Sequence, residues 1–123
     1  MTGTNKSAEL YERFLRFALN CLELVKLLPK TGYNQIYSNQ LTKSSSSVGA
    51  NYIETQETAS RKDFLHRLKI SRKEAKESKH WLRLISLANK NTVKIINPSN
   101  QLIKESEEIV KILSSSINTV LRK

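Results

Sequence analysis

Residues 61–90, RKDFLHRLKISRKEAKESKHWLRLISLANK, constrain the fold more strongly than any other part of the chain. Apolar side chains recur there at helical spacings of three, four or seven residues, at Phe64, Leu68, Ala75, Leu82 and Ile85. Because successive residues of an α-helix are rotated by about 100°, these side chains fall on one face. The stretch is therefore predicted to be one long helix, over about residues 60–89, with its apolar face packed inside the protein.

The other side of this predicted helix is strongly basic. Residues 61–90 hold ten of the chain's 21 Lys and Arg residues and three acidic residues, so +7 of the net charge of +10 lies there. The acidic residues lie on another side of the helix, so they do not interleave with the cations as an ion-pair network would. The cations predicted to form one outward flank, which we call the basic ridge, are Arg61, Lys62, Lys69, Arg72, Lys73, Lys76, Lys79 and Arg83.

Three further helices are predicted from apolar periodicity and from residues that start or stop helices. One covers about residues 7–28, with Ser7 as its N-cap and Pro29 as its stop. The others cover about residues 36–57 and about residues 98–121, the latter begun by Asn97-Pro98. Four such helices with short connections favour an all-α, antiparallel up-down-up-down four-helix bundle, with residues 1–123 as a single domain.

The serine run at residues 44–47 leaves two interpretations of the second helix open. Serine favours turns and caps over helix interiors, so the run is compatible with a linker. Leu41, Val48, Tyr52 and Thr55, however, keep a helical period across it. We interpret the segment as a helix with a narrow face of Ser and Ala that lets a neighbouring helix approach closely.

A second apolar strip lies beside the first on the basic helix. It consists of Ile70, Trp81, Leu84 and Ala88, mixed with Glu74 and Glu77. One helix cannot direct both strips into a single small bundle, so the second strip is predicted to be a subunit contact anchored by Trp81. The alternative is that Trp81 covers the edge of the core.

Composition excludes several classes of protein. Hydrophobic residues make up 38% and charged residues 26% of the 123 residues, which suits one folded globular domain. Cys21 is the single cysteine and lies among apolar residues, so a buried thiol is expected. The N-terminal sequence lacks the apolar region of a signal peptide, and no run approaches the length of a membrane span. We expect a cytoplasmic protein.

Catalytic and metal-binding patterns are weak. Asp63-x-x-His66 and Glu77-x-x-His80 have the spacing of ligands in dinuclear metal sites, but both pairs lie on one helix and point away from its apolar face. Cys21 has no base nearby in the sequence, and no phosphate loop or nucleophile turn occurs. We therefore expect no enzyme activity, no cofactor and no metal.

The basic ridge favours binding to the phosphate backbone of RNA or DNA, which would be independent of sequence and sensitive to salt. The ridge itself lacks aromatic stacking platforms, so base-specific or single-strand readout is less favoured than backbone binding. An anionic membrane surface is a weaker alternative, because few apolar residues stand ready to insert. A further alternative is a scaffold or adaptor whose basic face docks an acidic protein partner.

The residues around the second and third helices resemble a known family. Gln40-Leu41, Ala50-Asn51-Tyr52, Ser60 with Asp63-Phe64, and the run from Lys69-Ile70-Ser71 to Trp81-Leu82 resemble the bacterial four helix bundle protein family. This family includes proteins encoded in intervening sequences of large-subunit ribosomal RNA genes. It also includes the accessory variability determinant of diversity-generating retroelements. The resemblance covers about residues 8–121.

The resemblance implies an antiparallel bundle that assembles as a homopentameric ring. For the retroelement members it implies nucleic-acid binding and association with a reverse transcriptase. The chain reads Ala50-Asn51-Tyr52-Ile53-Glu54-Thr55 where the commoner family motif is Ala-Asn-Ile-Ala-Glu-Gly, so it looks more like the subgroup whose role is least defined. Asn51 is predicted to be a structural amide that fixes helix pairing beside a buried Tyr52.

Overall fold

The computed structural model describes residues 2–123, and their side chains from residue 6 onward. Its helices are α1 (Thr2–Leu27), α2 (Gly32–Glu54), α3 (Arg61–Ala88) and α4 (Val93–Arg122), with a short 3₁₀ turn, η1 (Thr55–Glu57), after α2. No strand occurs in this described part. The predicted all-α fold of four packed helices is confirmed, and the serine run at 44–47 is helical.

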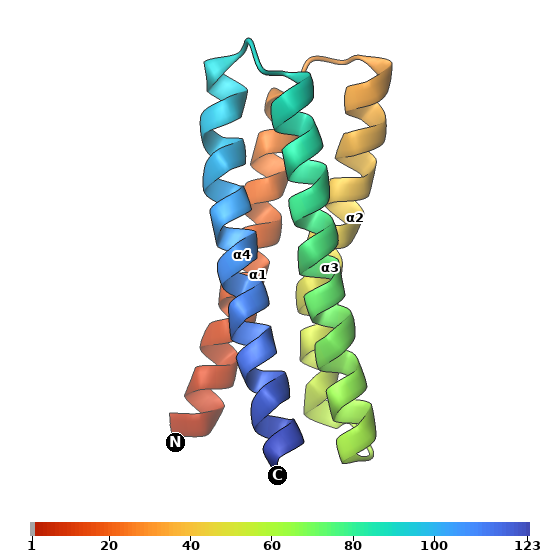
Figure 1. Cartoon of the computed structure of the whole chain (residues 1–123), viewed down its shortest axis with the longest axis vertical. Coiled ribbons are helices and arrows are strands. Elements are labelled where there is room, and N and C mark those ends of the chain that lie inside the picture. Colours follow the sequence, from red (N-terminus) through yellow and green to blue (C-terminus); the bar gives the residue numbers. More distant parts are fainter. Residues whose placement is uncertain (1) are drawn as a thin grey trace.

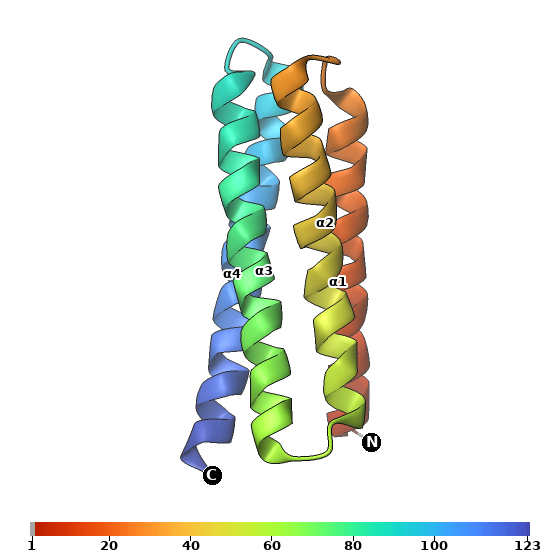
Figure 2. The ribbon, with the colours of Figure 1, turned by 90° about the vertical axis from the view of Figure 1, so that its right-hand side faces the viewer.

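The helices lie side by side along one long axis, and each packs on two neighbours (Figure 1). α3 packs closely on α2 and α4, whereas α1 packs more loosely on α2 and α4. The α1–α2 and α3–α4 connections lie at one end, called here the loop end. The α2–α3 connection lies at the other end, with both termini (Figures 1 and 2).

The predicted starts of α1, α2 and α4 are wrong, each for a physical reason. α1 begins at Thr2, and the Ser7 hydroxyl is hydrogen-bonded to the Tyr52 hydroxyl at 3.0 Å instead of capping a helix. α2 begins at Gly32, because Thr31 Oγ1 accepts a hydrogen bond from the backbone N–H of Asn34 and so acts as the N-cap. At α3, by contrast, the expected Ser60 cap is present, accepting from Asp63 N at 3.1 Å.

The start of α4 also differs from expectation. The helix begins at Val93, so Pro98 lies inside it and not at its first position. Proline removes one backbone hydrogen bond and normally ends a helix. Here the early turn is retained because it buries Ile95 completely against the other helices, and because Thr92 O accepts from the backbone N–H groups of Ile95 and Ile96.

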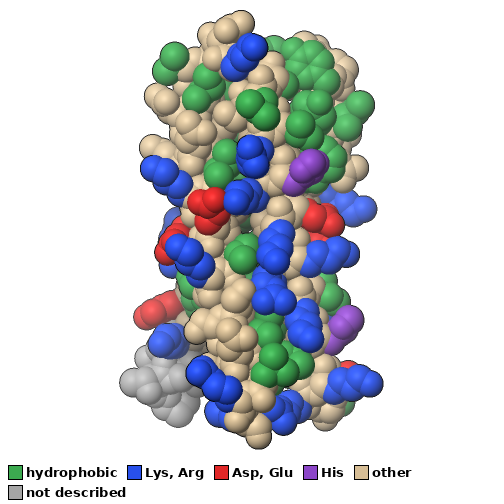
Figure 3. Space-filling model, in the orientation of Figure 1, with side chains coloured by type: hydrophobic (Ala, Val, Ile, Leu, Met, Phe, Trp, Pro, Cys, Tyr) green, Lys and Arg blue, Asp and Glu red, His purple; other side chains and the backbone are tan. Residues whose placement is uncertain are grey.

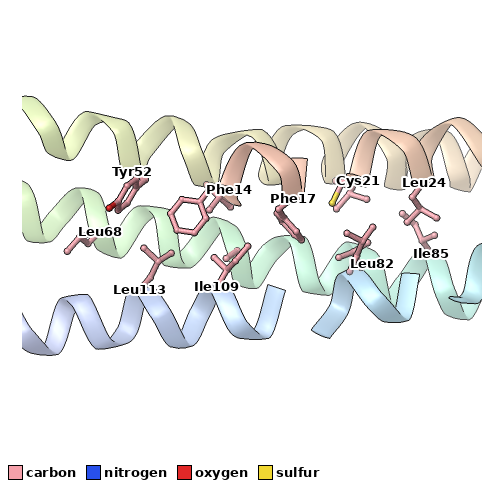
Figure 4. Close-up of a cluster of buried hydrophobic side chains, with 14 of the residues drawn as sticks. Phe14, Phe17, Cys21, Leu24, Tyr52, Leu68, Leu82, Ile85, Ile109 and Leu113 are labelled. Carbon is pink, nitrogen blue, oxygen red and sulfur yellow. The ribbon is translucent and has the colours of Figure 1, made fainter. Parts of the chain in front are cut away.

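The core runs the length of the bundle. Figure 4 shows side chains from all four helices meeting along its axis, with Phe14 and Phe17 of α1 near the centre. Phe14 packs edge-on against Tyr52, with ring centroids 5.0 Å apart. Buried positions include Phe14, Phe17, Cys21, Leu24, Leu41, Val48, Tyr52, Leu68, Leu82, Ile85, Ile109, Leu113 and Ile117.

Buried serines join α2 to α3. The Ser71 hydroxyl donates to the backbone carbonyl of Val48 at 2.7 Å, and the Ser78 hydroxyl donates to Ser44 Oγ at 2.9 Å. A side chain as small as serine lets the helix backbones come close enough for such direct contact. The predicted narrow face of α2 is therefore where α3 packs.

A reciprocal amide pair joins the two helices again at the loop end. The Asn34 side chain donates to Asn89 Oδ1 at 3.1 Å, and the Asn89 side chain donates to Asn34 Oδ1 at 3.0 Å. Both residues are buried. A buried polar group without a partner would cost about 1–3 kcal/mol, so this pairing specifies which residues meet there.

Gly49 provides a test of the α1–α2 packing. An added Cβ would lie 3.5 Å from Phe14 Cβ and 3.7 Å from Tyr11 Cε1, which are ordinary contact distances. Glycine inside a helix costs about 0.5–1 kcal/mol relative to alanine. We expect Gly49→Ala to raise the free energy of unfolding by about this amount, measured by urea denaturation.

Ala50→Gly is the matched control for Gly49→Ala, because Ala50 is exposed and adjacent on the same helix. It should lower stability by a similar amount. If Gly49→Ala destabilised the protein, the contact of α1 with α2 would be tighter than described.

Candidate nucleic-acid interface

The eight cations of the basic ridge all lie on α3, along its solvent side. Figure 3 shows Lys and Arg side chains gathered over the middle and lower part of α3, whereas hydrophobic side chains gather nearer the loop end of α2 and α3. Arg72 and Lys79 are half-buried, and the other six are exposed. The predicted clustering on one face of one helix is therefore present.

Three of these cations are tied to α4. The Arg61 guanidinium donates to the backbone carbonyl of Val120, and Arg72 Nη1 donates to Ser114 Oγ at 3.2 Å. Lys79 Nζ lies 2.8 Å from a carboxylate oxygen of Glu107. These contacts help to join α3 to α4, so the three side chains are less available to a ligand than the remaining cations.

The other five cations are free of such contacts. Within the described part of the chain, no ion pair or side-chain hydrogen bond is made by Lys62, Lys69, Lys73, Lys76 or Arg83. Lys69, Lys73 and Lys76 line a shallow hollow of about 390 Å³ together with Arg72, Glu77 and His80. Four cations against one carboxylate make this hollow attractive to an anion.

Carboxylates border the ridge on both sides. Burial, followed by the nearby Glu77, raises the pKa of Glu74 on the side of α2. On the side of α4, the hydrogen bond from Lys79 lowers the pKa of Glu107, and the charges of Lys79, Lys111 and Arg83 add to this effect. The cations of α3 therefore have carboxylates beside them on the side of α2 and on the side of α4.

The second apolar strip lies on the side of α3 toward α2. Ile70, Trp81 and Leu84 are half-buried, and Ala88 is exposed. Trp81 packs against Tyr37 of α2, with ring centroids 6.1 Å apart, so it has a partner within its own chain. A subunit contact at these four residues stays a prediction.

Aromatic residues adjoin the ridge, although none of its eight members is aromatic. His80 and Trp81 are neighbours on α3, and α2 brings Tyr37 and Tyr33 beside them. Sequence reasoning missed this group because the tyrosines lie more than forty positions before Trp81. Only the pairing of α2 with α3 places them together.

Asn51 makes the contacts of a structural amide. Its side-chain nitrogen donates to the Ser47 carbonyl at 2.9 Å, and its oxygen accepts from Arg67 Nη1 at 3.1 Å. Arg67 was not among the predicted functional cations, and this contact shows that it joins α3 to α2. The periodicity of the sequence already separates it from the outward flank.

The cysteine and the two histidines lie in different surroundings. Cys21 is buried, and desolvation raises the pKa of its thiol to about 12, against a smaller lowering by a hydrogen bond with Ser45. His66 and His80 are exposed on α3. The described residues contain no group of three or more His, Cys, Asp or Glu side chains placed to hold a metal ion. None of the described helices is long and apolar enough to cross a membrane.

Comparison with known proteins gives one family. A model of the family described as 23S rRNA-intervening sequence protein matches residues 6–115. A crystal structure of a protein of unknown function from the S23 ribosomal protein family of Bacteroides thetaiotaomicron VPI-5482 is 32% identical in sequence. The match covers 92% of this chain and 98% of the other, with a TM-score of 0.79. No curated protein matches the chain significantly.

The Lys79–Glu107 pair predicts how the ridge can be strengthened. We expect Glu107→Gln to tighten RNA binding, because it removes a bordering charge and releases Lys79 to contact a phosphate. The slope of log K against log salt should steepen by about 0.7–0.9, the value for one additional phosphate contact. Fluorescence anisotropy of a labelled RNA hairpin over a salt series measures both quantities.

Glu108→Gln is the control, since it makes the same change in net charge but releases Lys111 of α4 and not a cation of the ridge. Equal effects of the two substitutions would indicate that overall charge, and not the ridge, governs binding.

Proposed function

Because the chain belongs to the 23S rRNA-intervening sequence protein family, we propose that it is a non-enzymatic RNA-binding accessory protein that contacts the phosphate backbone through α3. The observation that carries this proposal is the set of five cations, Lys62, Lys69, Lys73, Lys76 and Arg83, that make no ion pair within the described part of the protein.

Free cations favour a phosphate ligand for a reason of energetics. An exposed ion pair within a protein contributes at most about 1 kcal/mol to stability. The five cations of like charge form no such pair, so α3 gains little stability from them. Those charges repel one another until an anion neutralises them. A polyanion that binds along α3 removes this repulsion and releases its own counterions, which makes association favourable at low salt.

RNA is the preferred ligand in this proposal because the family is named for ribosomal RNA. Contacts to phosphates alone would also admit DNA. The proposal in its widest form includes assistance to a retroelement reverse transcriptase, as the resemblance to the accessory variability determinant implies. Both roles, RNA binding and assistance to a reverse transcriptase, are proposed to take place in the cytoplasm.

Assembly into a ring-shaped homo-oligomer, with up-down-up-down bundles as subunits, is part of the proposal. The positions of the connections and termini in Figures 1 and 2 support that order of helices. A ring requires two different contact surfaces on each subunit. The second apolar strip, which consists of Ile70, Trp81, Leu84 and Ala88, is one candidate. The other is on α1, where Leu15, Leu19 and Leu22 are 38%, 61% and 39% exposed.

Charge reversal on the ridge tests the proposal. We expect the triple substitution Lys69→Glu, Lys73→Glu and Lys76→Glu to weaken binding of an RNA hairpin at low salt by about a hundredfold or more. The salt slope should fall by about 2–3, since three phosphate contacts are lost. All three side chains are exposed, so the circular dichroism melting curve should change little.

The control variant has the same three Lys→Glu substitutions at exposed positions outside α3, namely Lys30, Lys94 and Lys104. Its binding should decrease much less. Unchanged binding by the ridge variant would reject the proposed site. Absence of RNA binding by the unaltered protein at low salt would favour instead a scaffold that docks an acidic protein.

A further inference from the structure

Four aromatic side chains form a continuous series across α2 and α3, which we call the aromatic ladder. In order they are Tyr33, Tyr37, Trp81 and His80, with successive ring centroids 6.2, 6.1 and 4.8 Å apart. The first two contacts are tilted and the third is edge-on, so no ring in the series is stacked face to face on its neighbour. Within the ladder, the faces of the rings are therefore not covered by one another.

The ladder is partly open to solvent. Tyr33 is 46% exposed and His80 is exposed, whereas Tyr37 and Trp81 are half-buried at the edge of the core. Tyr37 and Trp81 both pack on the hydrophobic core, which holds their rings in place. The ladder therefore combines fixed inner rings with accessible outer ones.

The ladder is continuous with the basic ridge. His80, its last member, lines the same hollow as Lys69, Lys73 and Lys76. Toward the loop end the surface then becomes apolar and aromatic (Figure 3). A chain of phosphates lying on the ridge would accordingly lead directly to a row of aromatic rings.

We propose that the aromatic ladder stacks unpaired bases of a single RNA strand whose phosphates lie on the basic ridge. This inference rests on the proposed function and names the form of its ligand. It assigns Trp81 to that ligand in place of the subunit contact. Basic grooves followed by aromatic platforms are how proteins bind single strands without reading their sequence, because every base has an aromatic face.

The width of the ridge also favours one strand over two. From Lys62 to Arg83 the ridge extends about 32 Å along α3, at about 1.5 Å per residue. Glu77 lines the hollow of the ridge itself, Glu74 lies on the side of α2 and Glu107 on the side of α4. A single backbone can follow this strip, whereas the second strand of a duplex would lie toward the bordering carboxylates.

Trp81 is the single tryptophan of the chain, so its fluorescence reports directly on the ladder. The probes are an unstructured oligouridine of about 12 nucleotides and an RNA duplex of the same length. At equal salt, we expect the oligouridine to quench Trp81 emission with the same midpoint as its binding measured by anisotropy. The duplex should bind more weakly and leave the emission nearly unchanged.

Tyr33 is the residue to substitute, because its ring is 46% exposed and lies outside the hydrophobic core. Tyr33→Ala should weaken oligouridine binding roughly tenfold, the loss expected for one base–aromatic stack, and Tyr33→Phe should restore it. Ile36→Ala is the matched control, since Ile36 is apolar, 59% exposed and on the same helix but outside the ladder. It should bind as the unaltered protein does.

Three results would overturn the inference. They are equal effects of Tyr33→Ala and Ile36→Ala, no change in Trp81 emission on saturation with oligouridine, and a fall in the mass of the assembly caused by Tyr33→Ala. The last would assign the ladder to a subunit contact. If binding still depends on Lys69, Lys73 and Lys76 but not on Tyr33, the ridge stands and only the ladder fails.

Discussion

The close contact of α3 with α2 through buried serine hydroxyls determines much of what the surface displays. Ser71 reaches a backbone carbonyl of α2, and Ser78 reaches Ser44, so the register of the two helices is fixed by directed hydrogen bonds. Because α3 is held by this narrow face, its long cations point to solvent. The same register brings Tyr37 beside Trp81, so the ridge and the ladder both depend on the serines.

The cations of α3 divide into two groups with different roles. Arg61, Arg72 and Lys79 join α3 to α4, while the remaining five project freely. The sequence pattern treats all eight alike, since they share one flank of a helix. Only the position of α4 distinguishes them. The cations at the edge of the basic ridge thus contribute to the packing of α3 on α4. The cations along its middle are left for a ligand.

The number of helices, the apolar face of α3, the Ser60 cap and the buried Cys21 could all be predicted from local spacing and chemistry. The start of α4 could not, because burial of Ile95 outweighs the breaking tendency of Pro98. The ladder could not be predicted either, since Tyr37 and Trp81 meet only through the packing of distant segments. Local rules therefore describe the elements well, and contacts between elements remain a property of the tertiary structure.

The buried serines bear on how the stability of this bundle depends on temperature. Among the described residues, seven serines are buried, and no buried side-chain nitrogen or oxygen lacks a hydrogen-bond partner. Exposure of apolar surface on unfolding raises the heat capacity, whereas exposure of polar surface lowers it. A core that replaces methyl groups with hydroxyls accordingly has a smaller heat-capacity change, so its stability varies less steeply with temperature on either side of the maximum.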